Sequence, residues 1–261
     1  MIVVKFGGHA MKDENGAFAK AIAVAQRDGV ELVIVHGGGP QIDAALKSAA
    51  ITSEFVGGFR VTTPEIFDVV ERVLAGDVGP AVAQSLEREG VKAIAISGRK
   101  SGTLFAKPLK ALVDGTPADL GLVGVVTSVD SSSIMNAVAL RQVPVVSPIA
   151  CEESKDSGLN VNADLAAAAI AGALDAESLI IMTDVAGIYR SWPDKSSLIS
   201  EISYAELNSL KAGFAEGMAP KVQTCLDAID GGAKAVRIID GTDPSAFAAA
   251  LGNSGGTLVR K

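Results

Sequence analysis

The sequence predicts an α/β protein built as a three-layer, open and mainly parallel sheet that is flanked by helices. Short aliphatic runs alternate along the chain with longer segments of helical periodicity, a pattern typical of alternating strands and helices. Hydrophobic residues make up 48% of the 261 residues, so a sizeable core can form, whereas aromatic residues make up only 4%. A core rich in alanine and valine suits buried parallel strands better than a β-sandwich.

Composition also narrows the class of partner. The net charge of −7 argues against nucleic acid or a membrane surface as a partner, so positive charge would be local to a site for an anion. Cys151 and Cys225 are far apart and form no CxxC motif, which fits a reducing compartment. With only two histidines, we expect no histidine-based metal site. Because no leader precedes the first strand and no apolar run reaches membrane length, we expect a cytoplasmic protein.

Glycines end the first two predicted strands. The strand over 2–6 runs into two glycines, and the strand over 32–35 is followed by three more at 37–39. Pro40 then suits the first turn of a helix, because its missing N–H would have no partner there. Such a strand-to-helix turn aims N–H groups at an anion such as a phosphate or a carboxylate. The alternative is a tight turn that binds nothing, although three consecutive glycines are costly in backbone entropy.

Two positively charged residues are candidates for binding an anion. One is close to the first glycine turn, and the other precedes a later helix. Lys5 is near the end of the first strand, either as a lysine that extends to solvent at the sheet edge or as a cation that faces the same ligand. An amphipathic helix over 14–27 follows. Further on, Thr63 suits the cap of a helix that begins at Pro64. Arg60 precedes it, either as a surface arginine or as a planar fork for a carboxylate.

The middle of the chain continues the alternation. Helices over 64–75 and 80–89 lead to a strand over 93–97. Between residues 98 and 129, glycines and short β-rich pieces alternate, so we expect a small antiparallel excursion on the edge of the sheet. A helix over 132–140 and a strand over 143–147 resume the pattern.

Polar residues alternate where the next helix begins. Asn160, Asn162 and Asp164 would point to one side of an extended entry into the helix over 165–174. One alternative is that Asp164 only caps this helix. Two amides and a carboxylate that converge at a strand-to-helix junction nevertheless suggest a polar site, in which an aspartate orders neighbouring lysines.

The last third of the chain adds two candidates. The strand over 178–182 ends at Thr183 and Asp184, and ligands of open α/β sheets bind at the carboxyl ends of strands. Lys221 follows Pro220 in the first turn of a helix, where a cation opposes the helix dipole, as an anion-binding lysine would. The remaining predicted elements are helices over 204–211 and 244–251 and strands over 235–239 and 257–259.

Six segments together resemble the amino-acid kinase family, and within it the branch that phosphorylates N-acetyl-L-glutamate. They occur in the family's order and span nearly the whole chain, so the set is specific although each segment alone is weak. The segments are Val4-Lys5-Phe6-Gly7-Gly8, His36-Gly37-Gly38-Gly39-Pro40-Gln41, Gly58-Phe59-Arg60-Val61-Thr62, Asn160-Val161-Asn162-Ala163-Asp164, Thr183-Asp184-Val185 and Gly217-Met218-Ala219-Pro220-Lys221.

The resemblance implies the fold of that family, with two lobes. Residues 1–175 would bind acetylglutamate and residues 176–261 would bind ATP. The implied reaction is the ATP-dependent phosphorylation of the side-chain carboxylate, which gives an acyl phosphate for arginine synthesis. Phosphoryl transfer needs positioning and charge stabilisation more than a covalent nucleophile, and the substrate carboxylate is itself the nucleophile.

The resemblance also implies the roles of individual residues. Lys5 and Lys221 would stabilise the transferring phosphoryl group, and Asp164 would organise both lysines. Mg²⁺ would be bridged by the phosphates of ATP, with few ligands from the protein. Glycine N–H groups and two polar side chains would bind phosphoryl oxygens and the acid; they are Gly7, Gly8, Gly38, Gly39, Arg60 and Asn160. The nucleotide would be held around Thr183, Asp184, Gly187, Tyr189, Gly217 and Met218.

Departures from the family pattern bear on regulation. Members that arginine inhibits carry an extra N-terminal helix that links dimers into a ring, whereas the first strand here begins at Ile2. Asp240-Gly241-Thr242 also replaces an expected Asp-Gly-Arg. We therefore expect a homodimer that arginine does not inhibit.

Three alternatives stay open at this point. One is a kinase of the same fold that acts on an N-blocked aminoadipate of lysine synthesis, because one methylene discriminates weakly. Another is a non-catalytic amino-acid sensor of this fold, against which the joint presence of Lys5, Asp164 and Lys221 argues. The third, a dinucleotide-binding enzyme, is disfavoured because no GxGxxG follows a predicted strand.

Overall fold

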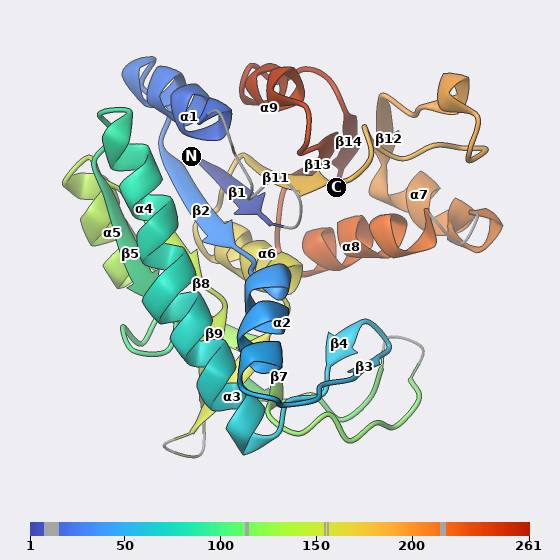
Figure 1. Ribbon diagram of the computed structural model, residues 1–261. Helices are drawn as coiled ribbons and strands as arrows, with labels where there is room; N and C mark the ends of the chain where they lie inside the picture. Colours follow the sequence, from blue (N-terminus) through green and yellow to red (C-terminus); the bar gives the residue numbers. More distant parts are fainter. Residues whose placement is uncertain (8–15, 113–114, 154, 156, 215–217) are drawn as a thin grey trace.

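A computed structural model describes residues 1–7, 16–112, 115–153, 155, 157–214 and 218–261. An eight-stranded sheet runs through the centre of the protein (Figure 1). Its strands are β1 (Ile2–Phe6), β2 (Leu32–His36), β5 (Ala93–Ser97), β8 (Val143–Ser147), β11 (Ser178–Thr183), β12 (Glu201–Ser203), β13 (Ala235–Asp240) and β14 (Thr257–Arg260). They lie in the order β12-β14-β13-β11-β1-β2-β8-β5. Only β13 and β14 pair antiparallel among these neighbours, so the predicted mainly parallel sheet is confirmed.

Helices cover both faces of the sheet, as a three-layer architecture requires. Successive strand residues alternate between the faces, so Val3 and Val4 are both fully buried but in different cores. One face packs against α5 (Ser132–Ala139), α6 (Ala163–Ala173), α7 (Tyr204–Leu210) and α8 (Ala219–Asp230). The other face packs against α1 (Ala17–Arg27), α2 (Gly39–Ser48), α3 (Pro64–Glu71), α4 (Gly79–Arg88) and α9 (Pro244–Leu251). Figure 1 shows α1 and α9 side by side in this layer.

One long helical segment replaces the two helices that we predicted over 64–75 and 80–89. Thr63 caps its start, where Oγ1 accepts from the Ile66 N–H at 3.3 Å. The π-helix η2 (Arg72–Val78) then joins α3 directly to α4, so the helical backbone continues through Gly76. Wider turns of this kind are rare and occur frequently at functional sites.

The strands that the structure describes between residues 98 and 129 do not lie on the edge of the main sheet, which corrects our prediction. β6 (Leu104–Pro108) and β7 (Val123–Val129) do pair antiparallel. They form a closed four-stranded barrel with β9 (Ile149–Glu152) and β10 (Gly158–Val161) instead of pairing with β5. Leu104, Ala106 and Val123 are almost fully buried, and closing the barrel covers them without leaving an unpaired edge.

Short elements complete the chain. A hairpin of β3 (Phe55–Val56) and β4 (Phe59–Arg60) precedes α3, and the 3₁₀ helices η3 (Lys195–Ser197) and η4 (Lys211–Gly213) flank α7. The other predicted helices and strands are confirmed to within a few residues where the structure describes them.

β1 is the centre of the arrangement. It pairs with β2 on one side and with β11 on the other, so the segments 1–175 and 176–261 share one continuous sheet. The division into an acid-binding and an ATP-binding lobe stays a prediction. Since β1, β2, β11 and β13 are parallel, their carboxyl ends meet at one edge of the sheet, which is where the predicted site residues follow in the sequence.

Candidate active site

A cavity of about 240 Å³ opens at the carboxyl ends of β1 and β11, beside the first turns of α6 and α8. It brings together side chains that are far apart in the sequence. Its lining consists of Lys5, Gly7, Asp164, Ile181, Met182, Thr183, Asp184, Pro220, Lys221, Thr224 and Ile238. Six of the predicted site residues therefore share one cavity.

Lys5 and Asp164 form an ion pair across this cavity. The ammonium Nζ lies 3.1 Å from Asp164 Oδ1, and the two side chains are 15% and 25% exposed. Oδ1 is buried and, among the described residues, has no partner with the angles of a hydrogen bond. Charge attraction rather than an aligned hydrogen bond thus holds the pair. Lys5 can consequently turn toward a second anion without losing a directional contact.

Asp164 is available for this pair because another residue caps α6. Asn162 Oδ1 accepts from the Asp164 N–H at 2.8 Å and from the Leu165 N–H at 3.3 Å. The alternative that Asp164 only caps the helix is therefore wrong. Its carboxylate belongs to the first turn of α6 and adds negative charge where the helix dipole favours it.

Lys221 reaches the same cavity from the first turn of α8. Its Nζ lies 3.1 Å from Asp184 Oδ1, and its side chain is 20% exposed. The expected arrangement, in which Asp164 organises both lysines, is thus present for Lys5 only in the described structure. Asp184 directly follows β11, and this position brings its carboxylate to Lys221.

Glycines let the first two strand ends approach each other. The Gly37 N–H donates to the Phe6 carbonyl at 2.8 Å. A Cβ at Gly7 would lie 3.2 Å from Lys5 Nζ, so glycine leaves room for the ammonium group. A Cβ at Gly38 would clash with Leu74 Cδ2 of η2, whereas the space around Gly39 is open. Gly38 and Gly39 form the start of α2 and do not line the cavity.

Arg60 is buried and belongs to a second group of side chains, outside the cavity. It is 6% exposed, its Nη2 lies 2.7 Å from Asp43 Oδ1, and its Nη1 donates to Ser53 Oγ at 2.7 Å. The guanidinium also stacks on the Phe55 ring, with its Cζ 4.5 Å from the centroid. Arg60 is therefore no surface arginine, because its guanidinium is buried and already contacts one carboxylate oxygen and one hydroxyl of the protein.

Asn160 connects to Arg60 through Thr62. Asn160 Nδ2 donates to Thr62 Oγ1 at 3.2 Å, and this hydroxyl donates to the Arg60 carbonyl at 2.7 Å. The two predicted acid-binding residues thus form one group. Neither of them lines the cavity that contains the lysines.

Three predicted nucleotide-binding residues also lie outside the cavity lining. Gly187 allows close packing, since a Cβ there would clash with Thr257 Oγ1, which accepts from the Ile188 N–H at 2.8 Å. Tyr189 packs on Trp192 with ring centroids 5.2 Å apart, and Met218 is buried. Gly8 and Gly217 lie outside the described residues.

Sequence reasoning missed several contributors. Thr224 lines the cavity one turn after Lys221, a spacing that a helix places on one face. No pattern in the sequence identifies Asp43 and Ser53 as the partners of Arg60.

His36 is fully buried, and burial lowers the pKa of its imidazole to about 4, so the ring is neutral near pH 7.

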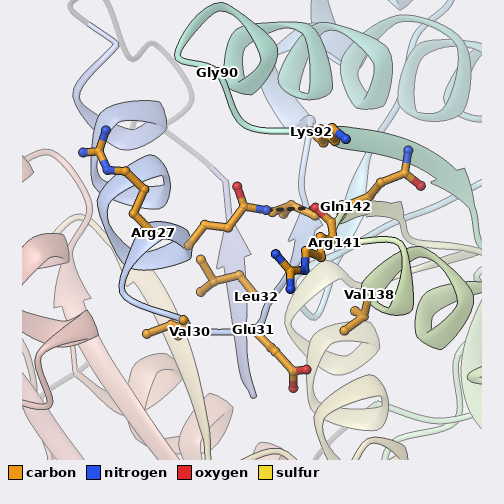
Figure 2. Close-up of a pocket in the computed structure, with 12 residues that line it drawn as sticks. Arg27, Val30, Glu31, Leu32, Gly90, Lys92, Val138, Arg141 and Gln142 are labelled. Carbon is orange, nitrogen blue, oxygen red and sulfur yellow. Dashed lines mark hydrogen bonds between the residues drawn. The ribbon is translucent and has the colours of Figure 1, made fainter.

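A larger cavity of about 640 Å³ lies at the opposite edge of the sheet, and Figure 2 shows its lining. None of the predicted site residues that the structure describes lines it. Two of its cations follow or end helices: Arg27 is in the last turn of α1, and Arg141 comes just after α5. Cations neutralise the negative ends of helix dipoles, so these two arginines have a structural explanation. The third cation, Lys92, directly precedes β5. Arg27 points away from Arg141, whose carbonyl accepts from Gln26 Nε2 at 3.1 Å (Figure 2).

Metal and membrane signals are absent from the part of the chain that the structure describes. There, no group of three or more His, Cys, Asp or Glu residues is placed to hold a metal ion. No helix in the same residues is both long enough and apolar enough to span a bilayer.

Comparison with known proteins decides the family. Residues 1–240 match the sequence model of the amino acid kinase family. The chain belongs to this family. Among members of the amino acid kinase family, the acetylglutamate kinase of Beutenbergia cavernae is 47% identical over 250 residues, which cover 95% of this chain and 80% of the relative. That of Corynebacterium glutamicum is 44% identical over 243 residues, which cover 92% of this chain and 82% of the relative.

Solved structures agree with this membership. The protein smu.665 of Streptococcus mutans is 28% identical and superposes with a TM-score of 0.80, covering 99% of this chain and 98% of that chain. The N-acetylglutamate synthase of Neisseria gonorrhoeae, solved with coenzyme A and N-acetyl-glutamate, has a TM-score of 0.82 at 24% identity. It matches the whole of this chain with 59% of its own, and likeness at this identity shows the fold alone.

Proposed function

We propose that the protein transfers the γ-phosphoryl group of ATP to the side-chain carboxylate of N-acetyl-L-glutamate, a step of arginine biosynthesis. The observation that carries the proposal is the pair of lysines, Lys5 and Lys221, which face one cavity at the strand ends. The relatives named acetylglutamate kinase, at 44–47% identity over most of the chain, supply the substrate class.

Lys5 and Lys221 are suited to a reaction in which negative charge moves with the transferring phosphoryl group. Each ammonium group has a carboxylate 3.1 Å away and is partly exposed. We propose that both turn toward the transferring phosphoryl group and stabilise the charge on its oxygens, while Asp164 keeps Lys5 in place. Because the acid's carboxylate is the nucleophile, no catalytic base is needed.

The segment 176–261 would form the ATP-binding lobe. Thr183 and Asp184 line the cavity beside Lys221, which supports a role at the phosphate end of the nucleotide. Gly187, Tyr189 and Met218 lie outside this lining, so their contact with the nucleotide stays a proposal from the family resemblance. Gly8 and Gly217 stay proposals from the family resemblance.

ATP would bring Mg²⁺ with it. The chemistry of the cavity fits this cation, since its lining contains two carboxylates, whose oxygens are ligands that Mg²⁺ accepts. Mg²⁺ supplies charge neutralisation on the phosphates when bound. Asp164 and Asp184 are the carboxylates of the lining that could contact it directly or through water.

The segment 1–175 would hold the acid. Arg60 and Asn160 form one group through Thr62, which supports a joint role at the α-carboxylate end of acetylglutamate. Gly38 and Gly39, at the start of α2, would supply N–H groups to its reacting end. Asp43 Oδ1 lies 2.7 Å from Arg60 Nη2, so we propose that this carboxylate occupies the place that the α-carboxylate of the acid takes when it binds.

We also propose a homodimer in the cytoplasm. The outer strand β5 has one neighbour in the described sheet, exposed Ile94 lies on it, and exposed Leu140 lies beside it. Free Cys151 and Cys225 suit a reducing compartment. Sedimentation would give about twice the 26.5 kDa of one chain, and a single-chain mass would contradict the dimer.

The test is a hydroxamate assay for acyl phosphate with Mg-ATP. It compares N-acetyl-glutamate with N-acetyl-aminoadipate, each with and without arginine. We expect product from acetylglutamate that arginine does not reduce. Product from the longer acid alone would move the protein to lysine synthesis, and no product from either, with ATP still bound, would favour a sensor. Inhibition by arginine would leave the function intact and contradict only the expected lack of feedback.

A further inference from the structure

His36 is a buried titratable residue for which the proposed reaction has no use so far. It is the last residue of β2 and directly precedes the glycines at 37–39. The ring is fully buried, and its Nδ1 lies 2.8 Å from the Gly37 carbonyl oxygen. Its Nε2 has no hydrogen-bond partner among the described residues. A polar group buried with one nitrogen unpaired is costly and calls for an explanation.

The contacts determine which ring nitrogen carries the proton. A carbonyl oxygen only accepts, so Nδ1 must be the donor to Gly37. Burial keeps the ring neutral near pH 7 by lowering its pKa to about 4. A neutral imidazole has one N–H, and Nε2 is therefore the bare nitrogen. The ring thus has one directional contact, and that contact is with the glycine loop.

This contact orients the peptide that joins Gly37 to Gly38. The C=O and N–H of a trans peptide point in opposite directions within one plane. Because the Gly37 carbonyl points at His36, the Gly38 N–H points away from the ring. In the described structure no acceptor takes a hydrogen bond from this N–H. It is consequently presented to a ligand at the start of α2.

The surroundings keep the loop and the ring in place. The Gly37 N–H is tied to the Phe6 carbonyl at 2.8 Å, which fixes the other side of the same residue. Leu74 of η2 packs against Gly38 so closely that a Cβ would not fit. On the far side of the ring, a Cβ at Gly79 would lie only 3.1 Å from Nε2. The π-helix η2 therefore packs against the glycine loop, and its junction with α4 packs against the imidazole ring.

We propose that His36 is a positioning residue, which holds the Gly37–Gly38 peptide so that the Gly38 N–H faces the carboxylate that accepts the phosphoryl group. This inference rests on the proposed function and deepens it. His36 itself touches neither substrate. It acts through the peptide, whose N–H stabilises charge on the reacting oxygens during transfer.

Two substitutions separate positioning from support of the fold. His36→Asn keeps an N–H donor close to the position of Nδ1, whereas His36→Leu keeps the bulk and removes the donor. We expect kcat for His36→Leu to fall roughly ten- to a hundredfold. This loss is smaller than that for deleting a hydrogen-bond donor to the reacting oxygens outright, because the Gly37–Gly38 peptide is still present in the variant. The KM for ATP should stay within about twofold, and His36→Asn should recover most of kcat. Val33→Ala, in the same strand but fully buried away from the loop, is the control for lost stability.

The result that would overturn the proposal is an equal loss in the Asn and Leu variants, or a kcat in His36→Leu that only follows the melting temperature as it does in Val33→Ala. A ¹⁵N NMR spectrum of the imidazole in the wild-type protein needs no substrate. A proton on Nδ1 supports the positioning role, and a proton on Nε2 contradicts it. If the wild type forms no acyl phosphate, the proposed function fails, and the ring spectrum still decides the role of His36.

Discussion

The lysines of the cavity and the buried Arg60 differ in how completely the protein satisfies their charges. Lys5 and Lys221 each have one carboxylate 3.1 Å away and remain partly exposed. Arg60 has Asp43 and Ser53 both at 2.7 Å and an aromatic ring beneath its guanidinium. A lysine is a mobile point charge, while the arginine fork is planar and rigid. This difference is what we expect if the lysines follow a charge that moves and Arg60 binds a carboxylate that stays in place, as we propose.

The largest expected effect comes from removing a cavity lysine. Lys221→Ala should lower kcat by roughly a thousandfold, because charge on the transferring group loses a preorganised cation. The KM for acetylglutamate should change by less than about threefold. Lys234→Ala is the matched control, since Lys234 Nζ pairs with Asp175 at 2.7 Å outside the cavity. A change in KM with kcat intact would show that Lys221 binds the acid, and the contrast with Arg60 would disappear.

His36 belongs to neither group, and its burial makes stability depend on pH. Its folded pKa of about 4 is below the value of 6.5 for a free ring, so the unfolded chain binds a proton that the folded chain does not. The free energy of unfolding should therefore be highest above pH 6.5 and fall as the pH drops toward 4, by on the order of 3 kcal/mol. His36→Asn should flatten this part of the urea-unfolding profile. An unchanged slope between pH 6.5 and 4 would assign the acid sensitivity to carboxylates.

Arg60 should affect binding rather than turnover. Arg60→Ala should raise the KM for acetylglutamate by roughly thirty- to a hundredfold, as expected when a charge-assisted, two-point contact is lost. Arg60→Lys should recover only part of it, because the fork is missing. The exposed Arg260, whose Nε lies 2.6 Å from Glu201, is the control. Unchanged affinity in Arg60→Ala would remove this residue from the acid site.

The smallest effect that we expect comes from changing Asp43. Its side chain is 58% exposed, although its partner Arg60 is buried. If its carboxylate stands in for the acid, Asp43→Asn should lower the KM for acetylglutamate by about two- to fivefold, the size of an exposed ion pair. The neighbouring Gln41→Ala is a control on the same helix. A higher KM in Asp43→Asn would mean that Asp43 orients Arg60 for the substrate instead of competing with it.

Short local patterns in the sequence were sufficient to predict the turns and helix starts that follow the strands. The glycines after β1 and β2, Thr63 as a cap and Lys221 in the first turn of α8 were all predicted, because turns and caps depend on neighbouring residues. Convergence of Lys5, Asp164 and Lys221 followed from the parallel sheet and the family resemblance.

Features that depend on distant contacts were not predictable in this way. The barrel forms because β6 pairs with β9 rather than with β5. The π-helix η2 forms where Leu74 packs against Gly38. Asp43 was missed as the partner of Arg60, because nothing in either residue's neighbourhood indicates the other. The same holds for Lys221, which pairs with Asp184 rather than with the predicted Asp164.

The rate of a single turnover shows whether the cavity lysines stabilise the transferring phosphoryl group. Enzyme with bound Mg-ATP is mixed with saturating N-acetyl-L-glutamate, and acyl phosphate is quenched and counted over time. Lys5→Met keeps the length of the side chain in β1 and removes its charge. We predict that transfer in Lys5→Met slows by roughly a thousandfold with ATP affinity nearly unchanged, while Lys234→Met transfers at the wild-type rate. Transfer at the wild-type rate in Lys5→Met would contradict the claim that this cavity stabilises the moving phosphoryl group.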